Sequence, residues 1–220
     1  MKVSSPAKLN LFLHVVGRRA DGYHLLQSVF VLIDWCDTLV FEVTSSPDIE
    51  WTAGNAAAQS LPAHNLINRA ARLLQQHTGC TQGARIQVHK HIHEQAGLGG
   101  GSGNAATTLL ALNHLWGLHL PQTELMALGT QLGADVPFFV QGRDAWVEGI
   151  GEHITPVDLG PQRWVVVKPA MGVATPALFQ SPLLRRDTPV TERADFCHQH
   201  TEAQWHSAHN DLQAPVMSQG

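Results

Sequence analysis

A cluster of four glycines in five positions, followed at once by helix-forming residues, is the part of this sequence most suited to chemistry. Gly97, Gly99, Gly100 and Gly101 have no Cβ, so the backbone there can adopt positive φ and approach a ligand closely. Apolar residues recur at helical spacing from about Gly103 onward. A glycine loop that enters a helix presents unpaired N–H groups and the positive end of the helix dipole. The stretch therefore predicts an anion site, and phosphate is the usual occupant.

The spacing of this loop differs from two common phosphate-binding patterns. The Walker pattern requires Lys and then Ser or Thr after its last glycine, where this chain has Gly103 and Asn104. The dinucleotide fingerprint G-x-G-x-x-G would end here on Ser102 or Asn104 instead of on glycine. A glycine-rich surface turn without a ligand is therefore the alternative for this stretch taken alone.

A lysine and an amide near the start of the chain form a second group of interest. Residues 8–16 alternate as a strand should, with leucines on one face and Lys8 and Asn10 on the other. Two polar side chains on one side of an apolar strand are arranged as a ligand-facing pair would be. A solvated lysine on an edge strand is the alternative.

Asp135 is the carboxylate that we pair with this lysine. A predicted helix at 121–132 ends at Gly133, and Pro137 favours an extended residue before it, so we expect Asp135 between a helix end and an apolar strand. A carboxylate is costly to bury unless it meets a cation or a ligand, and the helix dipole disfavours an anion at that end. We therefore interpret Asp135 as functional, with Lys8 as its cation; a solvated aspartate is the alternative.

Composition narrows the class of protein. The 220 residues carry a net charge of −4 with His neutral, and 15% of them are charged. The acidic balance without a basic stripe argues for small-molecule partners and against nucleic acid. Because no signal region or membrane-length apolar run is present, we expect a cytoplasmic protein without membrane association. Three widely spaced cysteines fit reduced thiols.

Histidine is abundant, with fourteen residues in the chain. His89, His91 and His93 alternate and would share one face of a strand. A zinc site is the alternative that this pattern raises, because histidine is the commonest metal ligand. We expect instead solvated or hydrogen-bonded histidines and no protein metal site, because the sequence shows no second group of ligand residues at metal-binding spacing beside them.

Strand and helix patterns alternate along the chain and must position these groups. A helix from 66 to 78 is predicted between Asn65 as N-cap and Gly79 as stop. Segment 45–64 is expected to be irregular, 152–162 to link two domains, and the tail to lack regular structure. Further helices are predicted from about 103 to 116, at 121–132 and at 176–179, and strands at 8–16, 25–33, 38–44, 85–92, 145–150 and 164–168, with a turn at 34–37.

The sequence resembles the GHMP kinases in three ordered stretches: PAKLNLFLHVVGRRADGYHLLQSVF, AGLGGGSGNAATTLLALNHLWGL and LGADVPFFVQGRDAWVEGIGE. The match runs in register from residue 6 to about 190, and it is to the branch whose substrate is cytidine diphosphate-linked methylerythritol. The resemblance implies a two-layer α/β (α+β) fold with an N-terminal ATP-binding domain at 1–158. A partial C-terminal domain is implied at 159–220, because the third glycine motif of the family is absent, and we expect this domain to be truncated.

The resemblance also assigns roles by position. Lys8 and Asp135 match the catalytic pair, with Asp135 as the base for the substrate 2-hydroxyl. Nucleotide-binding positions are matched by Asn65, Lys90, Gly97, Leu98, Gly99, Gly100, Gly101, Ser102 and Asn104. Substrate-binding positions are matched by Asn10, Tyr23, His24, Phe30, Thr175 and Phe179, with the cytosine ring stacked between Tyr23 and Phe179. ATP and Mg²⁺ are the implied cofactors, and Mg²⁺ would bridge the phosphate oxygens.

Three residues depart from the family pattern. His93 and Gln95 stand where the family usually has Pro and Gly, and Gly103 replaces a second Ser. Each neutral hydrogen bond is worth about 0.5–1.5 kcal/mol, so we expect weaker ATP binding and not its loss. We also expect low stability or weak activity of the 220-residue chain. A homoserine or mevalonate kinase and a nucleotide-binding protein with little catalysis are the alternatives, and the sequence leaves the oligomeric state open.

Overall fold

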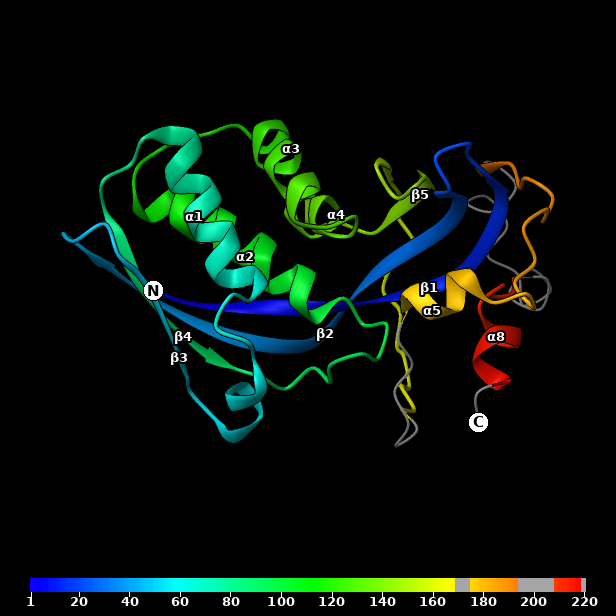
Figure 1. Ribbon diagram of the computed structural model, residues 1–220, viewed down its shortest axis with the longest axis horizontal. Coiled ribbons are helices and arrows are strands. Elements are labelled where there is room, and N and C mark those ends of the chain that lie inside the picture. Colours follow the sequence, from blue (N-terminus) through cyan, green and yellow to red (C-terminus); the bar gives the residue numbers. More distant parts are fainter. Residues whose placement is uncertain (169–174, 194–207, 219–220) are drawn as a thin grey trace. The chain divides into compact units, whose positions relative to one another are not determined.

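The structure is a computed structural model that describes residues 1–168, 175–193 and 208–218 (Figure 1). Strands β1 (Lys2–Arg18) and β2 (His24–Thr44) contribute residues to both of two compact units. None of the described helices is long and apolar enough to span a bilayer. The first unit contains Met1–Ala7, Ile33–Glu94 and Leu98–Gly142, and the second contains Lys8–Leu32, Gln95–Gly97 and Arg143–Gly220.

In the first unit the sheet contains β3 (Ile49–Ala53), β4 (Gly83–His89) and the last part of β2, and β1 also pairs with β2. Strand β4 pairs with β2 in antiparallel and with β3 in parallel orientation. Along β4, Ala84, Ile86 and Val88 are buried, and the residues between them are exposed. This alternation is typical of a strand with one covered face.

Helices cover that face of the sheet. Helix α1 begins after Asn65, whose Oδ1 accepts the N–H of Asn68 (3.1 Å), and ends at Gly79 with φ 68°, as predicted. Residues 103–109 of α2 are buried throughout, because they are small or apolar. In Figure 1 the helices of this unit lie on the same side of its strands: α1 (Leu66–Thr78), α2 (Gly100–Leu115), α3 (Gln122–Leu132) and α4 (Val136–Gln141).

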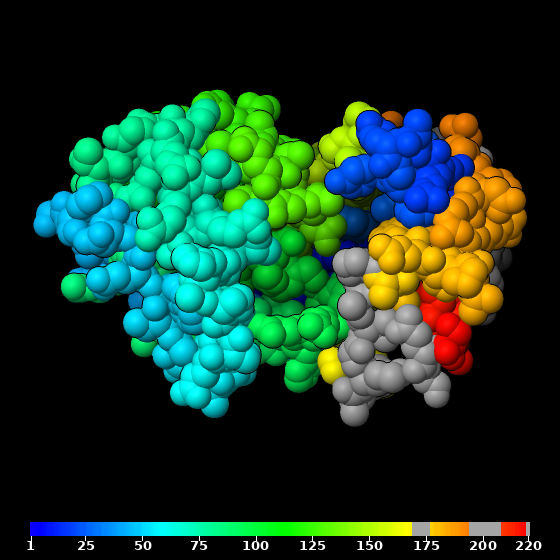
Figure 2. Space-filling model, viewed as in Figure 1, coloured from blue at the N-terminus to red at the C-terminus, as the bar shows by residue number. Residues whose placement is uncertain are grey.

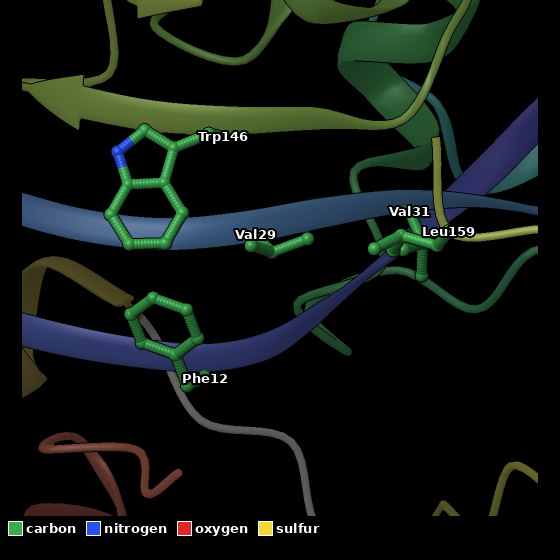
Figure 3. Close-up of a cluster of buried hydrophobic side chains, with 5 residues drawn as sticks. All are labelled: Phe12, Val29, Val31, Trp146 and Leu159. Carbon is green, nitrogen blue, oxygen red and sulfur yellow. The ribbon is translucent and has the colours of Figure 1, made fainter. Parts of the chain in front are cut away.

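The second unit is built on the first part of β2, which pairs in antiparallel orientation with β5 (Ala145–Gly149), and β5 pairs with β6 (His153–Pro156). Its core is a cluster of Phe12, Val29, Val31, Trp146 and Leu159. Figure 3 shows the rings of Phe12 and Trp146 next to one another near Val29; their centroids are 5.5 Å apart and their planes are tilted by 54°. The core of this unit therefore depends on β1, β2 and β5 together.

A second apolar cluster holds the later segments of the chain against β1. Leu13 and Val15 pack with leucines that follow α5 (Thr175–Gln180) and precede α8 (Gln213–Met217). The buried carboxylate of Asp211 accepts the N–H of Val15 (2.7 Å), so a side chain continues the backbone pairing here. The predicted short helix at 176–179 is confirmed, and the tail contains α8 where we expected no regular structure.

Two predicted strands and the turn between them are a single strand. Residues 34–37 are part of β2, so the predicted turn is wrong. The physical reason is that both carboxylates are accommodated within a continuous strand. Asp34 is exposed to solvent, and the buried carboxylate of Asp37 accepts several hydrogen bonds. The predicted polar face of β1 is also covered, since Lys8 and Phe12 are both buried.

The apolar run after Asp135 is a helix and not the predicted strand. Val136, which we expected to be extended, is the first residue of α4 (Val136–Gln141), and Asp135 before it has helical backbone angles (φ −83°, ψ −13°). Pro137 is tolerated because the first turn of a helix leaves its N–H groups unpaired in any case. A run of six mostly apolar residues is compatible with a buried strand and with a buried helix, so its pattern alone did not distinguish the two.

Three further segments differ from the sequence expectation. The segment expected to be irregular contains β3 and a short 3₁₀ helix, η1 (Ala56–Ser60). The expected domain link contains β6. Residues 164–168 are not a strand, and Val165 and Val167 are strongly exposed. Alternation of apolar residues is insufficient where no described neighbouring strand pairs with the segment.

Candidate active site

The glycine loop leads into α2 as predicted. Gly99 occupies the N-cap position with φ 68°, and no side chain caps the helix. The first helical bond runs from the N–H of Gly103 to the carbonyl of Gly99 (2.8 Å), so the preceding N–H groups of Gly100, Gly101 and Ser102 lie before it. Figure 2 shows green atoms of the segment that enters α2 at the surface. The geometry is that of an anion site at a helix N-terminus.

Gly100 and Gly97 are glycines for different reasons, which yields a matched pair of substitutions. A Cβ on Gly100 would lie 2.9 Å from Cγ2 of buried Ile92 and 3.3 Å from Nζ of Lys90, whereas a Cβ on Gly97 would meet open space at φ 72°. We expect Gly100→Ala to cost about 1–3 kcal/mol of unfolding free energy through overpacking. Gly97→Ala is expected to cost about 1–2 kcal/mol through backbone strain alone.

The readout that separates the two glycine variants is urea denaturation combined with the KM for ATP. We expect the KM to rise more in Gly100→Ala than in Gly97→Ala, because only the former displaces the start of α2. An equal effect of both variants on the KM would contradict this assignment.

Two residues that match nucleotide-binding positions are already engaged in the first unit. The amide of Asn65 caps α1 and also donates to the carbonyl of Pro62 (3.1 Å). The ammonium of Lys90 is buried and bonds to the carboxylate of Asp37. Their contacts with an adenine ring stay a prediction, and the observed role of both is to hold the local fold.

Asp37 is a residue that the sequence interpretation missed. Its side chain is 0% exposed and receives hydrogen bonds from the N–H groups of His91 (2.7 Å) and Ile92 (2.9 Å) and from Nδ2 of Asn104 (3.0 Å), besides that of Lys90. The sequence interpretation placed it at the end of a predicted turn at 34–37 and gave it no role. A signal was present nonetheless, because an aspartate among apolar strand residues needs a buried partner.

The segment around Asp135 lies beside the glycine loop within the first unit. A Cβ on Gly133 would be 4.0 Å from Oγ of Ser102, so the hydroxyl of Ser102 is directed toward the connection between α3 and α4. Asp135 is half-buried at the start of α4, and its carbonyl accepts the N–H of Phe139 (3.4 Å). Hydroxyl and carboxylate oxygens of this unit thus belong to neighbouring segments.

Lys8 and Asn10 share one side of β1, as predicted, and both belong to the second unit. The ammonium of Lys8 donates to Oδ1 of Asn10 and lies 4.2 Å from the centroid of the Phe30 ring. With 6% of its surface exposed, Lys8 is not a solvated edge-strand lysine. The second unit therefore brings together three of the residues that were predicted to meet the substrate or the reacting groups.

His24 contacts one of the two aromatic residues predicted to stack on cytosine. Its ring lies 5.2 Å from that of Phe179 at an interplanar angle of 30°, whereas Tyr23 is 61% exposed. Arg186 donates from Nε to Nε2 of His24 (3.1 Å) and from Nη2 to the carbonyl of Phe179 (3.1 Å). Arg186 was missed by the sequence interpretation. Thr175 begins α5, and its side chain lies outside the described residues.

Two histidines of the second unit have depressed pKa values. Desolvation, followed by the guanidinium of Arg186, lowers the pKa of His24 below 6.5. Desolvation, followed by the charge of His209, lowers the pKa of His14, which Asp211 partly opposes. Below pH 6.5 the folded protein therefore binds fewer protons at these sites than the unfolded chain does.

We expect stability to fall as the pH drops from 6.5 toward the lowered pKa values of His14 and His24. The contribution of both groups is complete above pH 6.5, where they are neutral in either state. Titration of the histidine Cε1 protons by NMR, with melting temperatures measured over the same pH range, checks this expectation. Midpoints at or above 6.5 for both rings would contradict it.

Among the described residues, no three His, Cys, Asp or Glu side chains gather as a metal-binding group. The Nε2 atom of His89 lies 3.2 Å from Oε1 of Gln87, within hydrogen-bond distance.

The two units divide the predicted site residues between them. The first carries Asp135 and every nucleotide-binding position except Gly97, and the second carries Lys8 and the substrate-binding positions.

Comparison with known proteins decides the family. The GHMP kinases N terminal domain matches residues 65–143. The 4-diphosphocytidyl-2-C-methyl-D-erythritol kinase of Methylibium petroleiphilum strain PM1 is 56% identical over 216 residues, which cover 98% of this chain and 73% of that protein. The chain belongs to the 4-diphosphocytidyl-2-C-methyl-D-erythritol kinase family. This membership confirms the predicted GHMP kinase resemblance.

Further members of this family agree with the assignment. The kinase of the same name from Polaromonas naphthalenivorans strain CJ2 is 54% identical over 215 residues, which cover 96% of this chain and 72% of that protein. A crystal structure of 4-(cytidine 5'-diphospho)-2C-methyl-D-erythritol kinase superposes with a TM-score of 0.79 at 36% identity, covering 100% of this chain and 78% of the other. The predicted fold class is thereby confirmed.

Proposed function

We propose that this chain transfers the γ-phosphoryl group of ATP to the 2-hydroxyl of 4-diphosphocytidyl-2-C-methyl-D-erythritol. The observation that carries the proposal is the uncapped start of α2, which follows a glycine loop and lies beside the segment of Asp135. The second unit supplies a buried Lys8 next to Asn10, together with an aromatic pair. We further propose that the protein acts in the cytoplasm on small molecules and not on nucleic acid.

Phosphoryl transfer requires in-line positioning and charge neutralisation more than covalent help from the protein. The N–H groups of Gly100, Gly101 and Ser102 hold the ATP phosphates. Asp135 accepts the proton of the 2-hydroxyl, whose oxygen forms the new bond to the γ-phosphorus while the bond to the β-bridging oxygen breaks and ADP leaves. Lys8 assists this step by offsetting negative charge on the transferred group.

The oxygens of the first unit suit a hard cation. Mg²⁺ prefers oxygen ligands and is usually held by one or two protein groups together with substrate phosphates. Ser102 offers a hydroxyl at the start of α2, so it would hold Mg²⁺ together with the ATP phosphates. When bound, Mg²⁺ neutralises charge on the phosphate oxygens.

Recognition of cytosine rests on the aromatic residues of the second unit. His24 and Phe179 already face one another, and Tyr23 has most of its surface open to a flat ring. Because Arg186 donates to Nε2 of His24, the neutral ring carries its proton on Nδ1. We propose that the base binds against these rings, with Tyr23 and Phe179 on its two faces.

Phosphorus NMR of the purified chain with ATP and 4-diphosphocytidyl-2-C-methyl-D-erythritol tests the proposal. We expect a new phosphomonoester resonance together with ADP, and none when homoserine or mevalonate replaces the cytidylyl substrate. Transfer to homoserine or mevalonate instead would favour those kinases. Binding of ATP without any phosphomonoester would favour a nucleotide-binding protein that does not catalyse.

A further inference from the structure

The carboxylate of Asp37 connects the two ends of the segment that contains the glycine loop. Its Oδ1 accepts the N–H groups of His91 (2.7 Å) and Ile92 (2.9 Å), where the chain leaves β4. Its Oδ2 accepts Nδ2 of Asn104 (3.0 Å), in the first turns of α2, and also binds the ammonium of Lys90. Residues 93–103 include every glycine of the loop. The residues on either side of this segment, Ile92 and Asn104, are thus both hydrogen-bonded to the Asp37 carboxylate.

The entry to this segment is fixed further by Asn55. Its amide donates to the carbonyl of Lys90 (2.8 Å) and accepts the N–H of the same residue (3.1 Å). The exit depends more on Asp37, because Asn104 is 2% exposed and its Oδ1 has no hydrogen-bond partner among the described residues. The orientation of the Asn104 amide is therefore set by the acceptor that Asp37 provides.

We infer that Asp37 is a positioning residue for the phosphate loop. By holding both ends of residues 93–103, it keeps the unpaired N–H groups at the start of α2 aimed at the triphosphate. This inference rests on the proposed function, since it concerns the same loop. The carboxylate is completely buried and acts through Asn104 and the backbone, without contact to the nucleotide.

Two other roles for Asp37 predict different behaviour. If the carboxylate served only to neutralise Lys90, replacing both charges would leave phosphate binding unchanged. If Lys90 acted only through the adenine ring, its replacement would weaken ATP binding but not the binding of inorganic tripolyphosphate. The experiment must therefore vary Asp37 at constant charge of residue 90, and it must include a probe without a base.

A pair of variants meets these requirements. Lys90→Gln removes the cation but keeps a donor for Asp37, and Lys90→Gln with Asp37→Asn differs from it only by a carboxylate exchanged for an amide. That exchange preserves an oxygen for His91 and Ile92, but it places an amide NH₂ opposite the NH₂ of Asn104. Glu50→Gln is the matched control, because Glu50 is an exposed carboxylate that pairs with Arg85 (3.2 Å) on the neighbouring strand.

Calorimetric titration with ATP and with tripolyphosphate, combined with hydrogen exchange, provides the measurement. We expect the double variant to bind tripolyphosphate at least about tenfold more weakly than Lys90→Gln. This corresponds to a difference of about 1.4 kcal/mol in binding free energy. Affinity for the cytidylyl substrate should stay within about twofold, as expected when the effect is confined to the loop. Exchange should accelerate in residues 93–104 and not in α3.

The outcomes separate this inference from the proposed function. Equal tripolyphosphate affinity and equal exchange at 93–104 in the two variants would overturn the role of Asp37. Wild-type protein that binds neither ATP nor tripolyphosphate would overturn the proposed function. The exchange data alone would then show whether Asp37 holds the two ends of residues 93–103. Accelerated exchange throughout the first unit would indicate a general structural role and would also overturn the inference.

Discussion

Replacing Asp135 by Asn is expected to lower kcat by at least about 10²-fold, because a positioned general base contributes about 10²–10⁴-fold. The introduced amide has nearly the same shape but cannot accept the proton of the attacking hydroxyl. Asp135 is half-buried at the start of α4, and α4 is held by its own buried residues, so the fold should persist. Initial rates from ADP release, with melting temperatures alongside, provide the measurement.

Asp34→Asn is the matched control for this variant. Asp34 is an exposed carboxylate on β2 and has no role in the proposed mechanism, so its replacement should leave kcat within about twofold, as surface substitutions usually do. Near-normal turnover by Asp135→Asn would remove Asp135 from the reaction. Equal losses in both variants would point to a general effect of charge.

Replacing Phe12 by Ala is expected to cost about 3–5 kcal/mol of unfolding free energy, the range for large aromatic side chains removed from a core. Phe12 is 2% exposed and packs against Trp146 and Val29 in the core of the second unit (Figure 3). The same strand carries Lys8 and Asn10, so a cavity beneath it should also reduce activity. Urea denaturation followed by tryptophan fluorescence measures the stability.

Leu110→Ala on α2 is the control for the loss of an apolar side chain. Leu110 is 38% exposed, so its removal leaves no closed cavity and should cost less than about 1 kcal/mol. A cost below about 1 kcal/mol for Phe12→Ala as well would show that the second unit does not depend on this cluster.

The elements that sequence predicted well are those specified by local signals. Asn65 and Gly79 bound α1, and Pro121 and Gly133 flank α3, because caps and stops act on their own helix. The glycine loop likewise leads into a helix whose start no side chain caps. Lys8 and Asn10 share a side because they are two residues apart on one strand.

The features that sequence did not reveal depend on partners distant in the chain. Asp37 is paired with Lys90 and Asn104, 53 and 67 positions away, and these contacts allow β2 to continue through a predicted turn. Arg186 reaches His24 over 162 positions. Local pattern contains no information about such contacts. The pairing of Lys8 with Asp135 stays a prediction, because the two residues belong to different units.

The bare N-terminus of α2 has a consequence for competitors of the nucleotide. A helix without its own cap is completed by whatever acceptor arrives, so bound anion and secondary structure reinforce one another. A neutral compound that fills the same space would leave three amide protons dehydrated and unsatisfied. Inhibitors of this protein should therefore include a sulfonate, carboxylate or phosphonate directed along the axis of that helix.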